Sequence, residues 1–254
     1  MTRFVVLTLF DSMFDAFVNT SIIKRALEKN LVSIDVVDIR NFTLDKHKRV
    51  DFPPCGGGSG MIISCEPLSR AIEFAKDKLN SYDGGRKSNI RIIYLSPRGK
   101  VLNYDLCKNL STSLENCILI CGHYEGIDER IIEEYGVEEI SIGDYVLTGG
   151  ELASQVLMDS VIRLIPGVLS DGSLDEESHT TCLLEYPQYT KPVIFRDRKV
   201  PDILLSGHHK NISLYRKAEA IRITKKYRPD LYLKYQKECL DEERKKHENV
   251  NEKS

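Results

Sequence analysis

The stretch of sequence that decides the fold is a short strand that runs into a glycine-flanked loop, Asn116-Cys-Ile-Leu-Ile-Cys121 followed by Gly122-His-Tyr-Glu-Gly126. The apolar run of this strand, between an asparagine and a glycine, is typical of a buried strand. Ligands of open α/β sheets bind at the carboxyl ends of the strands, which is where this loop lies. Glu125 is therefore a candidate functional residue. The acids Asp128 and Glu129, by contrast, are explained by the first turn of the next helix.

Strands and helices alternate on both sides of this stretch. The apolar spacing predicts strands over residues 3–10, 31–39, 89–95, 116–121 and 138–142, and helices over 14–29, 67–79, 104–113 and 126–135. Such alternation predicts an α/β fold with a mostly parallel sheet that helices cover on both faces. Residues 151–165 form a further predicted helix that is apolar nearly all round, so we expect it to be buried in the core or against another subunit.

The polar, turn-forming stretch Ser170–Ser178 separates two parts of different charge. Residues 1–181 hold 27 Asp/Glu and 19 Lys/Arg, a net charge of −8, whereas residues 182–254 hold 17 Lys/Arg and 11 Asp/Glu, a net charge of +6. The basic part favours a polyanionic partner. We expect a first domain over 1–169, a linker over 170–176 and a small, mainly helical basic domain over 177–254, with helices over 211–227 and 229–240 and a frayed tail from Asp241.

Several protein classes are excluded by composition. The chain has no run of about 18 apolar residues, so we expect no membrane span. The apolar N-terminal run is cut short at Asp11, which disfavours a secretory signal. Seven cysteines at irregular spacing, with no Cys-x-x-Cys pair, predict reduced, buried thiols of a cytoplasmic protein rather than a metal site.

A glycine-rich loop, Cys55-Gly-Gly-Gly-Ser-Gly-Met61, invites comparison with nucleotide-binding loops. A P-loop needs a lysine and a hydroxyl residue after its last glycine, and a dinucleotide-binding loop needs a further glycine three residues on; the chain has neither. The glycine spacing does match Rossmann-type methyltransferases, but Pro53 and Pro54 interrupt the strand that should precede it. Two interpretations remain, namely a close approach of the backbone to a ligand or chain segment, and a simple turn.

A third segment, Ser141-Ile-Gly-Asp-Tyr-Val-Leu-Thr-Gly-Gly-Glu151, mixes apolar residues with glycines. Glycines leave backbone N–H and C=O groups accessible beside apolar side chains, which is the environment that a purine ring requires. A ligand-binding loop and a plain strand–turn–helix both agree with this pattern.

Together these segments resemble bacterial tRNA (guanine-N1-)-methyltransferases of the SPOUT class, over the chain from the first strand to about Leu240. The resemblance is carried by the three segments above and by Tyr94-Leu-Ser-Pro-Arg-Gly99, Glu185-Tyr-Pro-Gln-Tyr-Thr-Lys-Pro192 and Leu205-Ser-Gly-His-His209. The chain departs from the family at Cys55 and Ser59, where Tyr and Pro are usual, and at His123, where Arg is common.

The resemblance implies a homodimer whose first domain contains a deep trefoil knot, a feature that no pattern argument would propose. It also implies that S-adenosylmethionine binds in the knot. The binding residues that it implies are Tyr94, Leu95, Ser96, Gly122, Ile142, Gly143, Asp144, Tyr145, Val146, Leu147, Gly149 and Gly150.

The reaction that the resemblance implies is methyl transfer to N1 of guanosine 37 in tRNA, at an active site shared between subunits. Arg163 corresponds to the family's arginine at guanine O6, and Glu177 stands in the linker where the family has an aspartate before a serine. Asp175 and Glu176 are alternative bases, and Glu177 is preferred because it alone precedes the serine, Ser178.

On the basic part, tRNA contacts are expected from Tyr215, Arg222 and Lys226, and on the first domain from His123. Mg²⁺ is a candidate aid to the proton transfer.

Two other functions agree less well with the residues. A SPOUT methyltransferase for another RNA site, such as a ribose 2′-oxygen, would not need a carboxylate base placed for a purine N1–H, and a non-catalytic RNA-binding protein would not need the 142–147 segment.

Overall fold

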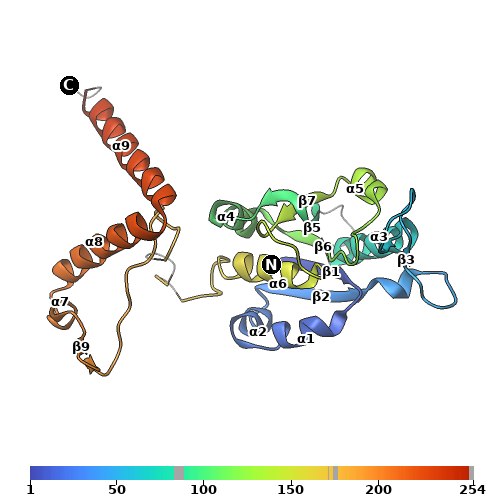
Figure 1. Cartoon of the computed structure of the whole chain (residues 1–254), viewed down its shortest axis with the longest axis horizontal. Helices are drawn as coiled ribbons and strands as arrows, with labels where there is room; N and C mark the ends of the chain where they lie inside the picture. The colour runs from blue at the N-terminus through green and yellow to red at the C-terminus, as the bar shows by residue number, and fades with distance from the viewer. Residues whose placement is uncertain (83–88, 171, 174–176, 252–254) are drawn as a thin grey trace. The chain divides into compact units, whose positions relative to one another are not determined.

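The computed structural model describes residues 1–82, 89–170, 172–173 and 177–251, with side chains described as far as residue 241. The chain divides into two compact units, Met1–Ser170 and Asp171–Ser254 (Figure 1). Among the helices described, none has the length and the apolar composition that crossing a membrane would require.

The first unit is built on a five-stranded sheet in which every pair of neighbouring strands is parallel (Figure 1). The strand order across this sheet is β2 (Val32–Asp38), β1 (Thr2–Thr8), β6 (Asn116–Ile120), β5 (Ile90–Val101) and β7 (Glu138–Ser141). The prediction of an α/β fold with a mostly parallel sheet is confirmed. A separate antiparallel pair, β3 (Asp51–Phe52) and β4 (Ile62–Ile63), flanks the glycine-rich loop.

Helices cover both faces of the sheet because side chains of successive strand residues point to opposite sides. Phe4 and Val6 of β1 belong to one hydrophobic core, and Val5 and Leu7 belong to the other. The first core is closed by α2 (Ser21–Glu28), α4 (Tyr104–Ser113) and α6 (Glu151–Ile162). The second is closed by α3 (Cys65–Tyr82) and α5 (Glu129–Tyr135).

Two predicted helices of this unit are broken or shortened in their N-terminal part. The predicted helix over 14–29 is three elements, a 3₁₀ turn η1 (Asp11–Phe14), α1 (Asp15–Val18) and α2, because Thr20 is extended and Ser21 has a φ of 51°. The predicted helix over 126–135 begins only at Glu129, since the side chain of Asp128 accepts a hydrogen bond from Arg130 N and caps it. The chain between β2 and β3 includes a second 3₁₀ turn, η2 (Ile39–Phe42).

Helix α6 is buried along one face rather than all round. Leu157 and Met158 are fully buried in the first core, whereas Leu152 and Val156 are 49% and 45% exposed. The helix also ends at Ile162, three residues before the predicted end, and continues as tighter turns to Val168. An apolar strip therefore remains on its outer face in this chain.

The second unit contains a hairpin of β8 (Ile194–Phe195) and β9 (Arg198–Lys199), followed by helices α7 (Asp202–Leu205), α8 (His209–Tyr227) and α9 (Pro229–Asn251). The expectation of a frayed tail from Asp241 is wrong as far as Asn251, because α9 continues to that residue. Glu, Lys and Arg, which dominate this stretch, are good helix formers, and their charge does not prevent a helix.

All seven cysteines are free thiols, but they are not all buried. Cys117 and Cys121 in and after β6 are fully buried, and burial raises the pKa of both thiols well above its usual range. Cys55, at the start of the glycine-rich loop, is exposed, so the expectation of buried thiols fails there.

Replacing Leu157 by Ala tests the first core. We expect the free energy of unfolding to fall by about 2–5 kcal/mol, because a fully buried side chain is lost and leaves a cavity. The matched control is Leu44→Ala, at a residue that is 82% exposed, with an expected change within about 0.5 kcal/mol. Urea unfolding of both variants measures the difference, and equal effects would contradict the described packing.

Candidate functional site

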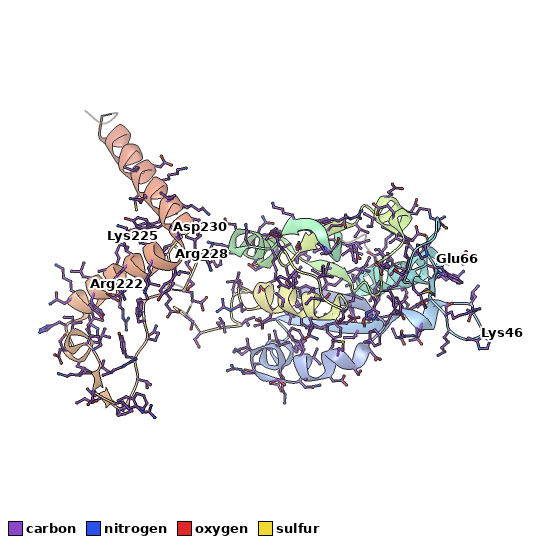
Figure 2. All side chains as sticks on the ribbon, viewed as in Figure 1. Lys46, Glu66, Arg222, Lys225, Arg228 and Asp230 are labelled. Carbon is purple, nitrogen blue, oxygen red and sulfur yellow. The ribbon has the colours of Figure 1, made fainter. Side chains whose placement is uncertain are left out.

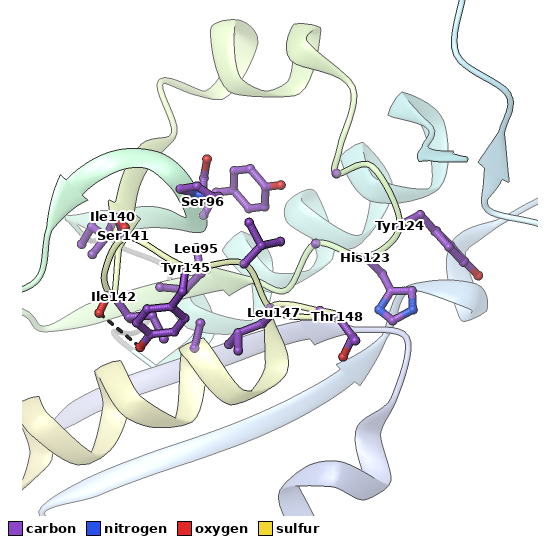
Figure 3. A pocket seen from close by; sticks show the side chains of 18 of the residues that line it. Leu95, Ser96, His123, Tyr124, Ile140, Ser141, Ile142, Tyr145, Leu147 and Thr148 are labelled. Atoms are coloured by element: carbon purple, nitrogen blue, oxygen red, sulfur yellow. Dashed lines mark hydrogen bonds between the residues drawn. The ribbon is translucent and has the colours of Figure 1, made fainter. Parts of the chain in front are cut away.

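A cavity of about 230 Å³ lies where strands β6 and β7 end, and three chain segments far apart in the sequence enclose it (Figure 3). The segments are 94–97 within β5, 122–126 after β6, and 140–150, which begins in β7, with Ala153 of α6 behind them. The cavity therefore occupies the position at which open parallel sheets bind ligands.

The wall formed by residues 141–147 is a loop held by its own short contacts. The Ser141 hydroxyl accepts a hydrogen bond from Gly143 N at 3.2 Å and donates one to Gly143 O at 3.1 Å. The Tyr145 hydroxyl donates to Ile142 O at 3.4 Å, as Figure 3 shows. Gly143 has a φ of 146°, and a Cβ there would lie 2.6 Å from the Tyr145 ring, so the loop requires glycine at this position.

The end of this segment meets the 122–126 segment backbone to backbone. Gly150 N donates to Gly122 O at 2.8 Å, and His123 and Gly149 form an isolated β-bridge. A Cβ on Gly150 would lie 2.8 Å from Cys121 Cα and 2.9 Å from Gly122 N, and backbone atoms cannot move aside as the end of a flexible side chain can. A Cβ on Gly122 would lie 2.7 Å from the Tyr94 ring. The glycines thus bring polar backbone groups close to apolar side chains.

The buried carboxylate of Glu151 connects the end of this segment to the first strand. Glu151 is 2% exposed and accepts a hydrogen bond from the Thr8 hydroxyl at 2.7 Å, while Thr8 Oγ1 itself accepts from Phe10 N at 2.9 Å. The carboxylate also lies in the first turn of α6, where the helix dipole stabilises negative charge. The first strand is thereby tied to the beginning of α6.

Three polar side chains of the cavity have different surroundings. Burial raises the pKa of the Tyr94 hydroxyl, which keeps it protonated at neutral pH. The His123 ring packs 4.8 Å from Phe10 and 4.6 Å from Tyr124, and its Nδ1 atom is buried with no hydrogen-bond partner in the described part of the chain. Glu125 is exposed at the cavity's edge.

The glycine-rich loop is where Glu125 meets another part of the chain. Glu125 N donates to Met61 O at 3.0 Å, and a Cβ on Gly60 would lie 2.5 Å from Glu125 Oε1. Gly60 has a φ of 93°. Of the two interpretations of the loop, the structure therefore favours a close approach between chain segments at its last glycine.

The structure brings together most of the residues expected to bind a cofactor. All twelve except Asp144 line the cavity, as do His123 and Glu125. Sequence reasoning missed seven further lining residues, each within two residues of an expected one or in the first turn of α6: Pro97, Tyr124, Gly126, Ile140, Ser141, Thr148 and Ala153.

The expected catalytic pair lies in different units. Arg163 directly follows α6, is half-buried, and is not among the residues that line this cavity in the first unit. Glu177 lies in the second unit, where it lines another cavity of about 520 Å³ together with residues of α8 and α9. The alternative bases Asp175 and Glu176 lie outside the described residues.

Basic side chains in α8 and directly after it have close acidic or aromatic neighbours; Figure 2 labels Arg222, Lys225, Arg228 and Asp230. Arg222 pairs with Glu219 at 2.7 Å, and Arg228 pairs with Asp230 at 2.6 Å. The Lys226 ammonium lies 4.8 Å from the centre of the Tyr227 ring. Tyr215, on the same helix, is half-buried.

Comparison with known proteins gives a consistent result. The family model described as tRNA (Guanine-1)-methyltransferase TrmD matches residues 2–234. A tRNA (guanine-N(1)-)-methyltransferase of Ruminiclostridium cellulolyticum is 52% identical over 91% of this chain and 97% of the relative. Proteins of the same name from Malacoplasma penetrans and Clostridioides difficile are 50% and 48% identical, over 93% and 91% of this chain and 99% and 98% of the relatives.

Proposed function

The chain belongs to the tRNA (guanine-1)-methyltransferase family, and from that premise we propose that it methylates N1 of guanosine 37 in tRNA, 3′ to the anticodon. Members of this family are S-adenosylmethionine-dependent methyltransferases that act on guanine N1 of tRNA. At the site, the proposal rests on the cavity, whose walls of glycines and apolar residues have the composition that an adenosine ring requires.

The residues present fit S-adenosylmethionine, which supplies a methyl group already activated by its sulfonium. Leu95, Ile142 and Leu147 offer apolar walls, and Gly122 and Gly150 leave backbone groups accessible between them. We propose the twelve expected residues as the binding set, with Asp144 acting from outside the described lining. We also propose that the three segments that enclose the cavity, residues 94–97, 122–126 and 140–150, form the trefoil knot of the family.

The guanine N1 atom that receives the methyl group determines what the catalytic residues must do. Guanine N1 carries a proton at neutral pH, so a base must take that proton as the N1–C bond forms. We assign this role to the Glu177 carboxylate. We assign to the Arg163 guanidinium a hydrogen bond to O6, where negative charge develops as the proton leaves. Glu125, at the edge of the cavity, is a further catalytic candidate.

A homodimer with a shared active site is part of the proposal. The apolar residues Leu152 and Val156 of α6 are 49% and 45% exposed, and Val146, beside the cavity, is 82% exposed. A second copy of the chain would cover such apolar surface. We propose that Glu177 of one copy then reaches the active site of the other across the dimer interface.

The remaining parts of the proposal concern the second unit and the surroundings of the enzyme. We propose that the second unit is the tRNA-binding domain, with contacts from Tyr215, Arg222 and Lys226, and that His123 contacts tRNA beside the cavity. Because tRNA is the substrate, the proposed location is the cytoplasm. The described residues contain no group of three or more His, Cys, Asp or Glu side chains that could hold a metal ion. Mg²⁺ stays a candidate aid to the proton transfer.

The position of methylation is tested with labelled S-adenosylmethionine and two tRNA transcripts that differ only at nucleotide 37. We expect label in the transcript with guanosine there and none in the transcript with adenosine. Adenine has an amino group in place of the O6 acceptor, so the Arg163 guanidinium would face another hydrogen-bond donor. Mass spectrometry of the digested tRNA locates the methyl group. Equal labelling of both transcripts would contradict the assignment.

The base is tested by Glu177→Gln, which keeps the shape of the side chain but cannot accept the proton. We expect kcat to fall by about 100-fold or more, in line with the usual contribution of a general base. The affinity for S-adenosylmethionine, measured by calorimetry, should stay the same. Glu176→Gln and Asp175→Asn are the controls, and a comparable loss in either one would move the assignment to that residue.

The cavity is tested by Gly150→Ala. Its added Cβ would meet backbone atoms of residues 121 and 122, so the walls must separate. We expect the affinity for S-adenosylmethionine to fall at least about tenfold, equivalent to about 1.4 kcal/mol. The control is Gly136→Ala at the end of α5, which has a φ of 58° and open space around it and so measures backbone strain alone. Unchanged affinity in Gly150→Ala would refute the described contact.

A further inference from the structure

The segment that carries Glu177 is a folded turn in the second unit. Thr180 N donates to Glu177 O at 3.3 Å, His179 N donates to Leu183 O at 2.8 Å, and Glu185 N donates to the Ser178 hydroxyl at 3.0 Å. These bonds close residues 177–185, named here the linker turn, upon itself. The place of the Glu177 carboxylate in this unit therefore depends on where the linker turn is attached.

One attachment is a hydrogen bond to a buried threonine of α8. Leu184 N donates to Thr224 Oγ1 at 2.8 Å, and the same hydroxyl donates to Ala220 O, one helical turn earlier, at 2.7 Å. Thr224 is fully buried, and Leu183 and Ala220 beside it are 6% and 8% exposed. A buried N–H that loses its partner is costly, so this bond fixes the linker turn on α8.

A second attachment joins the linker turn to α9. The Cys182 thiol donates to Glu238 Oε1 at 3.1 Å. Partial burial, together with the nearby Glu238 carboxylate, raises the pKa of this thiol, which keeps it a donor at neutral pH. This bond is more exposed than the one to Thr224, and we expect it to contribute less.

Helix α8 also carries the proposed tRNA contacts. Arg222 and Lys226 lie two residues before and two residues after Thr224. One short, regular piece of helix therefore bears both the side chains proposed to bind tRNA and the hydroxyl that holds the linker turn. A helix transmits position with little distortion over such a short distance, because each of its residues is fixed by backbone hydrogen bonds.

We propose that Thr224 is a positioning residue for methyl transfer: it couples the tRNA-binding helix to the linker turn, so that tRNA bound on α8 sets the place of the Glu177 carboxylate. The inference rests on the proposed function, in which Glu177 is the base. It predicts that loss of the Thr224 hydroxyl impairs the chemical step while both ligands still bind.

The test compares Thr224→Val, which keeps the shape of the side chain but removes the hydroxyl, with Thr224→Ser, which keeps the hydroxyl. In full-length enzyme with saturating tRNA and S-adenosylmethionine, we expect the single-turnover rate of Thr224→Val to fall between about tenfold and 100-fold, the effect of a small misplacement of a catalytic group. Thr224→Ser should stay within about threefold of the wild type. KM for tRNA and the affinity for S-adenosylmethionine should change little in either variant.

A double-mutant cycle separates positioning from general loss of structure. If Thr224 acts through Glu177, Thr224→Val should have almost no further effect on the rate in the Glu177→Gln background, since coupled residues are not additive. Multiplicative losses in the double variant would overturn the inference. So would a wild-type rate in Thr224→Val, or a matching rise in KM for tRNA accompanied by loss of helical circular dichroism.

Failure of the inference and failure of the proposed function give different results. If Glu177→Gln alone turns over like the wild type, the assignment of the base is wrong and the inference falls with it. If Glu177→Gln loses its activity while Thr224→Val is fully active, the assignment of Glu177 as the base is upheld and only the role of Thr224 is overturned.

Discussion

The first unit depends on one contact in which no side chain fits between two backbones. Gly150 lies against Cys121 and Gly122 and donates a hydrogen bond to Gly122 O at 2.8 Å. This contact fixes where α6 begins relative to the end of β6. The start of α6 in turn places Glu151 against Thr8 of β1, and the residues before Gly150 become one wall of the cavity. The sheet, the helix and the binding site are thus held in place by the same few atoms.

The sheet was predictable because its signal is local. Short apolar runs between turn residues identify strands wherever both faces of a sheet are covered, and the predicted strands over 116–121 and 138–142 match β6 and β7 to within a residue at each end. The predicted helix over 104–113 has the bounds of α4. By contrast, the break at Thr20 and Ser21 follows from a backbone conformation, without a glycine or proline to mark it. Apolar spacing alone cannot detect such a break.

The cavity was predictable only through a resemblance between whole motifs. Composition and spacing left the 141–151 segment undecided between a ligand loop and a plain turn, since both place glycines among apolar residues. Contacts between distant segments, such as the one between Glu125 and Gly60, have no signature along the chain. The attachment of the linker turn to Thr224 is of the same kind, because a threonine inside a helix carries no mark of the partner that it bonds 40 residues away.

The distribution of the thiols makes the molecule easy to label at one place. Maleimides react with accessible thiolates, and Cys117 and Cys121 are shielded by full burial and a raised pKa. Cys55 is the exposed thiol of the seven. A fluorophore would attach preferentially at this residue, at the start of the glycine-rich loop. The chain therefore carries a native labelling site for following that loop by fluorescence, once the partly exposed Cys65, Cys182 and Cys239 are replaced.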